Sequence, residues 1–85
     1  MIDTHKAVAK TLELARKYDL DAMSSDNKDA DYKHLQFMQE TMNATAFSEA
    51  KLNRWLGWIQ ACVYINSMGE ITLEDLKQIN KEFST

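Results

Sequence analysis

The chain has 85 residues, of which 45% are hydrophobic and 27% are charged, and its formal net charge is −3. This length allows one domain with one small core, and the hydrophobic content is typical of a folded chain rather than a disordered one. Ten basic side chains against thirteen acidic ones make duplex nucleic acid and an anionic membrane poor partners, because both require a basic patch.

The residue types predict an all-α fold. Proline is absent and only two glycines occur, so little interrupts a helix, and the recurring residues Ala, Leu, Lys, Glu, Gln and Met favour helices. Cys62 is the one cysteine of the sequence, which rules out an internal disulfide. Residues 1–17 mix charges throughout and lack an apolar signal core, so we expect a cytoplasmic protein.

The first helix is expected to run from Asp3 or Thr4 to Tyr18. Val8 and Leu12 belong to one apolar row with helical spacing, which indicates a face turned towards the core. The side chain of Asp3 or Thr4 can accept a hydrogen bond from the free amides of the first turn.

An acidic stretch, residues 19–31, follows. It holds five aspartates and one lysine, a local charge of −4. Asp, Ser and Asn favour turns and helix caps, so we expect residues 19–27 to be an acidic linker between the first two helices, with Leu20 and Met23 packed on the core. Two interpretations remain open: a solvated linker whose side chains cap helices, or an acidic surface that meets a basic patch on another protein.

The second helix is expected over residues 28–43, with Ser25 or Asp26 as its cap. Its inward face carries apolar residues at i, i+3 and i+7: Leu35, Met38 and Met42. Two methionines among three positions predict a soft, adaptable face.

The third helix, about residues 48–68, has clear signals at both ends. Ser48 suits the N-cap, and Phe47 and Leu52 occupy the two positions of a hydrophobic staple around it. Gly69 follows the last apolar residue and can adopt the left-handed conformation that ends many helices.

The middle of this third helix carries no charge over residues 55–68, a run too short to span a membrane. A helix that is apolar on most of its circumference must be covered on most sides, so we expect it to be the long central helix. Gly57 lies inside it and costs about 1 kcal/mol relative to alanine. We expect close approach of another backbone, or room for a neighbouring ring, to compensate.

The fourth helix is expected over residues 72–83. Thr72 is its N-cap, and Asp75 stands three residues later, where it can complete a short variant of the capping box. Because the connection from the third helix is tight, the two helices should form an antiparallel hairpin. The sequence therefore predicts one all-α domain, a small bundle of four helices.

No arrangement of residues predicts chemistry. His5, His34 and Cys62 fall on three different helices without metal-ligand spacing, and no glycine-rich loop exists to hold phosphates. Cys62 lies in the least polar part of its helix, where burial makes a thiol inert. We expect no catalytic residue, no cofactor and no metal, and therefore not an enzyme.

The aromatic residues of the third helix admit two interpretations. Core packing is the ordinary use of a tryptophan pair, but Trp55, Trp58 and Tyr64 on an uncharged helix exceed what a few thin helices can cover. Exposed apolar patches indicate association, and tryptophan and arginine are preferred anchors of interfaces. We expect a homo-oligomer formed through part of this helix, with Arg54 and Gln60 as a polar rim. The candidate interaction surface is Arg54, Trp55, Trp58, Gln60, Tyr64 and Ile65.

Residues 51–60, 69, 72–77 and 80 read KLNRWLGWIQ, G, TLEDLK and N. This segment resembles small accessory proteins of uncharacterised function that are encoded in phages and prophages of enteric bacteria. The resemblance implies a setting in the bacterial host cytoplasm and an accessory protein that binds a host or phage protein and inhibits or redirects it.

Two alternatives use the same residues differently. In the first, the protein binds a small ligand such as a nucleotide at an oligomer interface, where Trp55, Trp58 or Tyr64 stacks on a base and Arg54 or a lysine meets phosphate. In the second, it is a helix-turn-helix-like regulator, although the fourth helix has more acidic than basic residues and so lacks the character of a recognition helix.

Overall fold

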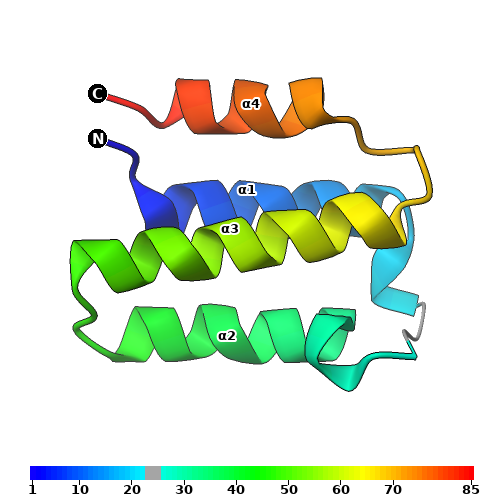
Figure 1. The fold of residues 1–85 in the computed structure, drawn as a ribbon, viewed down its shortest axis with the longest axis horizontal. Coiled ribbons are helices and arrows are strands. Elements are labelled where there is room, and N and C mark those ends of the chain that lie inside the picture. Colours follow the sequence, from blue (N-terminus) through cyan, green and yellow to red (C-terminus); the bar gives the residue numbers. More distant parts are fainter. Residues whose placement is uncertain (23–25) are drawn as a thin grey trace.

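The computed structural model describes residues 1–22 and 26–85. Within these residues the chain forms four α-helices and two short 3-10 helices: α1 (Thr4–Lys17), η1 (Leu20–Ala22), η2 (Lys28–Ala30), α2 (Tyr32–Ala44), α3 (Glu49–Asn66) and α4 (Leu73–Glu82). The chain runs up and down, so that α1 and α3 point one way and α2 and α4 return (Figure 1). The prediction of an all-α fold with four helices is confirmed.

Helix α1 lies at the heart of the bundle. It begins where predicted, because the Asp3 carboxylate accepts a hydrogen bond from the Lys6 amide at 3.1 Å. It packs against α2, α3 and α4, and its inward side chains are almost completely buried. These include Ala7, Val8, Thr11, Leu12 and Ala15.

The start of α2 differs from the prediction. The helix begins at Tyr32 rather than at residue 28, because Asp31 is its cap and accepts hydrogen bonds from the amides of Lys33 at 2.9 Å and His34 at 3.4 Å. Asp26 is therefore not the cap of α2. The inward face of α2 is as predicted, and the buried residues are Tyr32, Leu35, Met38 and Met42.

The acidic segment before α2 contains more local structure than a plain linker. Leu20 lies in η1 and is buried, as expected. Asn27 caps η2 by accepting a hydrogen bond from the Asp29 amide at 3.0 Å. The expectations for Met23 and Ser25 concern residues outside the described part of the chain.

Helix α3 starts at the predicted cap, where the Ser48 hydroxyl accepts from the Lys51 amide at 3.2 Å. It ends at Asn66, slightly before the predicted end. Met68 and Gly69 follow with positive φ angles of 50° and 94°, which end the helix. The buried hydroxyl of Ser67 donates to the Tyr64 carbonyl at 2.8 Å and accepts from the Ile71 amide at 3.0 Å. This side chain binds the chain on both sides of the turn and so directs it away from the helix axis.

Helix α4 carries the predicted capping box. The Thr72 hydroxyl accepts from the Asp75 amide at 3.2 Å, and the Asp75 carboxylate accepts from the Thr72 amide at 2.9 Å. The helix then returns antiparallel to α3 (Figure 1), so that its end lies near the start of α1.

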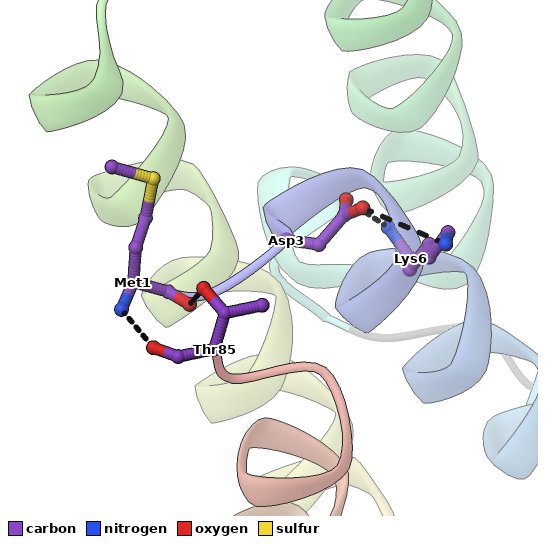
Figure 2. A network of polar contacts seen from close by, with 4 residues as sticks. All are labelled: Met1, Asp3, Lys6 and Thr85. Carbon is purple, nitrogen blue, oxygen red and sulfur yellow. Dashed lines mark hydrogen bonds and ion pairs between the residues drawn. The ribbon is translucent and has the colours of Figure 1, made fainter.

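The two ends of the described chain lie side by side. The Met1 ammonium donates to the Thr85 carbonyl at 3.1 Å, and the Thr85 hydroxyl donates to the Met1 carbonyl at 3.3 Å, as Figure 2 shows for this corner of the molecule. The Thr85 amide also donates to the Met1 carbonyl, at 2.9 Å. One step inward, the Asp3 amide donates to the Phe83 carbonyl at 2.9 Å. These bonds hold the end of α4 against the start of α1.

Candidate functional site

One side of α3 faces away from the bundle. The core side of the helix carries Leu56, Ile59 and Val63, which are buried, and a second set of residues lies on the opposite side. We call this second set the outer face of α3. It consists of Ala50, Arg54, Gly57, Trp58, Ala61, Tyr64 and Ile65, with Met68 just beyond the helix end, and all of them are exposed.

The outer face is apolar in most of its area. Trp58 is 44% exposed, Tyr64 38%, Ile65 69% and Met68 86%. No charged residue occurs from residue 55 to residue 68. The expectation that α3 is covered on most sides is therefore wrong, because the other helices cover its core side and leave the outer face to solvent.

Four of the six residues of the candidate interaction surface lie on the outer face: Arg54, Trp58, Tyr64 and Ile65. Trp55 is turned to one side and is only partly exposed. Its ring meets the ring of Phe47 edge to face at 4.9 Å, and the Lys51 ammonium lies 5.5 Å from the Trp55 ring centre. Trp55 therefore belongs to the packing around the start of α3.

Gln60 is buried, so its prediction as a rim residue is wrong. Its amide nitrogen donates to the Asn80 side-chain oxygen at 2.8 Å and to the Thr11 hydroxyl at 3.2 Å, and the Asn80 amide donates back to the Gln60 oxygen at 3.1 Å. The side chain thus joins α3 to α1 and α4. Its spacing from Leu56 and Val63, four residues before it and three after, placed it on the core side of the helix.

Trp58 has a partner that the sequence did not reveal. Its indole N–H donates to the Asp29 carbonyl at 3.2 Å, and about two helical turns further the Asn66 side-chain amide donates to the Ala30 carbonyl at 2.8 Å. Two side chains of α3 thus hold η2 against the helix. As a consequence, the Trp58 ring is fixed in orientation while a large part of it stays open to solvent.

Gly57 has no compensating neighbour within the chain. A Cβ atom built at this position would meet nothing within 4 Å, and the residue is exposed. The expected close approach of another backbone or ring is therefore wrong for the single chain. An interior glycine costs about 1 kcal/mol of helix stability. No contact of Gly57 in the described structure offsets this cost.

Arg54 is the charged residue among those that form the outer face. Arg54 forms no ion pair with any residue that the structure describes, although it stands at the start of the uncharged run. The ion pairs of the described residues are exposed contacts between residues three apart, such as Lys77–Glu74 at 3.7 Å. Such pairs contribute little to stability.

The polar residues considered for chemistry lie apart. Among residues 1–22 and 26–85, no group of three His, Cys, Asp or Glu side chains is placed to hold a metal ion. The His5 ring lies 3.2 Å from the Asn43 side-chain oxygen, and His34 is half-buried beside Phe37. Burial raises the pKa of the Cys62 thiol, which keeps the reactive thiolate scarce.

No helix in the described part of the chain is both long enough and apolar enough to cross a membrane. No family model, curated protein or solved structure matches the chain. The outer face of α3 is the feature of the described surface with the largest grouping of exposed apolar side chains.

Proposed function

We propose that this protein is a non-enzymatic accessory protein that acts by binding another protein through the outer face of α3. In the phage or prophage setting that the sequence resemblance implies, the partner is a host or phage protein in the bacterial cytoplasm, which the binding inhibits or redirects. The observation that carries the proposal is the uncharged, exposed face formed by Trp58, Tyr64, Ile65 and Met68.

The composition of this face is that of a binding surface. Small soluble proteins rarely leave a contiguous apolar patch of several hundred Å² open, and such patches usually mark association sites. The centre of a protein interface is depleted in charge and enriched in Trp, Tyr, Met and Arg. The outer face has this character, with one arginine at its edge.

The face is also held rigidly. The indole of Trp58 is fixed by its hydrogen bond to the Asp29 carbonyl, and α3 is anchored from the opposite side by the bonds of Gln60. A surface that is ordered before binding loses less entropy when the partner arrives. Rigid aromatic anchors on a packed helix therefore favour specific binding.

Affinity capture from bacterial lysate with matched variants tests the proposal. Ile65→Asp places a charge on the outer face, whereas Phe37→Asp makes the same kind of change at a residue on α2 that is 59% exposed. We expect the same partner to be captured by the unmodified chain and by Phe37→Asp, and to be lost with Ile65→Asp. A partner retained equally by all three would show that binding occurs elsewhere.

A second candidate function is nucleotide binding where copies of the chain meet. It is favoured by the exposed rings of Trp58 and Tyr64 on the same face as Arg54, which has no ion pair among the described residues. Stacking of a base on such rings contributes about 1–3 kcal/mol, while the net charge of −3 opposes phosphate. Titration of tryptophan fluorescence with a nucleotide panel tests it, and a flat response would refute it.

A further inference from the structure

The outer face of α3 has a regular spacing. Its central residues are separated alternately by four and three positions, in the order Ala50, Arg54, Gly57, Ala61 and Tyr64. This spacing is that of the contact seam of a coiled coil. Here the seam lies on the exposed side of the helix, separate from the residues with which α3 packs in its own core.

Small residues occupy the middle of this seam. Gly57 and Ala61 lie one turn apart, and a Cβ at Gly57 would point into open space. Small side chains at a helix contact let two backbones approach closely. An approaching helix would therefore supply the contact that Gly57 lacks within its own chain.

We propose that a second copy of this chain covers the outer face, with the two α3 helices packed antiparallel about a two-fold axis and Gly57 of each copy facing Ala61 of the other. This inference rests on the proposed function because it uses the same face, for which the host or phage protein then competes with the second copy. The partner is a second copy of the chain, and the register is the one in which the two α3 helices meet.

The register follows from the order of residues along the seam. When Gly57 faces Ala61 of the second copy, Arg54 faces Tyr64, and the two-fold axis repeats each pair. The arginine thus meets a tyrosine ring, on which a guanidinium stacks favourably. Trp58 and Ile65 line one flank of the seam and meet the same flank of the second copy.

A parallel pair is disfavoured by the same residues. It would place Arg54 directly against Arg54 of the second copy and leave a gap where two glycines meet. In the antiparallel register the two arginines are separated by about 15 Å along the axis, from ten residues at 1.5 Å each, which exceeds the screening length of about 8–10 Å at physiological salt. The rest of the seam is uncharged, so no other repulsion arises in it.

The available area suits a dimer. The exposed fractions of Trp58, Tyr64, Ile65 and Met68 correspond to on the order of 500 Å² of side-chain surface, given the 150–250 Å² of a large aromatic residue. Arg54 and the small residues between them add to this. The total approaches the roughly 800 Å² per partner of a standard interface, about a tenth of a small protein's surface.

The mass of the purified chain in solution, measured by light scattering or sedimentation equilibrium over a dilution series, tests the inference without any other protein. We expect a dimer for the unmodified chain. Gly57→Leu fills space that is open in the single chain, so the fold remains intact and the melting temperature of the monomer does not fall, whereas the dimer dissociation constant rises about 10- to 100-fold. Phe37→Leu, at an exposed residue of α2, leaves the dissociation constant unchanged.

Cysteine cross-linking with a short bismaleimide tests the register. Cys62 is buried and its pKa is raised, so it reacts slowly. We expect cross-linked dimers when copies carrying Arg54→Cys are mixed with copies carrying Tyr64→Cys, and little product with either variant alone. A parallel pair would reverse this pattern and overturn the proposed register.

A monomer at all concentrations, or a dimer indifferent to Gly57→Leu, would overturn the inference. These outcomes are separate from the fate of the proposed function. A monomeric chain that still captures a partner through Ile65 refutes the dimer alone, and a dimer that captures nothing refutes the binding of a host or phage protein.

Discussion

Replacement of Gln60 by alanine tests whether this side chain joins three helices. Gln60 is 8% exposed and makes hydrogen bonds to Thr11 at 3.2 Å and to Asn80 at 2.8 and 3.1 Å. Each bond contributes about 0.5–1.5 kcal/mol, and a polar group left unpaired in a buried place costs about 1–3 kcal/mol. Thr11 keeps its bond to the Ala7 carbonyl and Asn80 is partly exposed, so we expect a loss of about 2–3 kcal/mol in the free energy of unfolding.

The assay is urea denaturation at one fixed protein concentration, because association would add to the apparent stability. A double-mutant cycle with Asn80→Ala isolates the reciprocal pair, for which we expect a coupling of about 1–2 kcal/mol. A change within about 0.5 kcal/mol for Gln60→Ala is what an exposed side chain gives. That result, together with no coupling to Asn80, would refute the buried position of Gln60.

Four further predictions concern single side chains. Ile59→Ala creates a cavity in the core and should lower the free energy of unfolding by about 2–5 kcal/mol, while Lys81→Ala on the solvent side of α4 should change it by no more than about 0.5 kcal/mol; equal effects in urea titrations would contradict the packing. Asp31→Ala removes the cap of α2 and should lower the free energy of unfolding by about 1 kcal/mol in the same assay. No loss would show that another residue caps this helix. Gly57→Ala should raise monomer stability by about 1 kcal/mol, and a loss would reveal a neighbour at that site. The Cys62 thiol should react with a disulfide reagent more slowly than a free thiol at pH 7–9, because its raised pKa leaves less thiolate; urea should abolish the difference, and fast reaction in the native state would contradict burial.

The residues that cap α3 and α4 could be predicted from the sequence. Ser48 and the pair Thr72 and Asp75 act as caps in the structure as predicted, because a cap depends on residues only three positions apart. The start of α2 was not readable, since several Asp, Ser and Asn residues before it can all serve as caps. The structure favours Asp31, in a segment whose backbone is held by the distant side chains of Trp58 and Asn66.

The residues of the outer face could be predicted from the sequence only in part. The uncharged run on α3 indicated surplus apolar surface, and Trp58, Tyr64 and Ile65 are exposed. The polar character of Gln60 suggested a rim, although its helical position is on the core side and its partners lie on α1 and α4. Local sequence holds no information on such partners, because residues 20 or more positions apart meet only through the packing of whole helices.

The proposed role of the outer face as a protein-binding surface is tested most directly by hydroxyl-radical footprinting. The chain is labelled in dilute pure solution and again in concentrated bacterial lysate, and oxidation is read by mass spectrometry. We predict protection of Trp58, Tyr64 and Met68 in the lysate, with Met1 and Phe37, which are 75% and 59% exposed, labelled equally in both. Equal labelling of the outer face in the two samples would contradict the proposal.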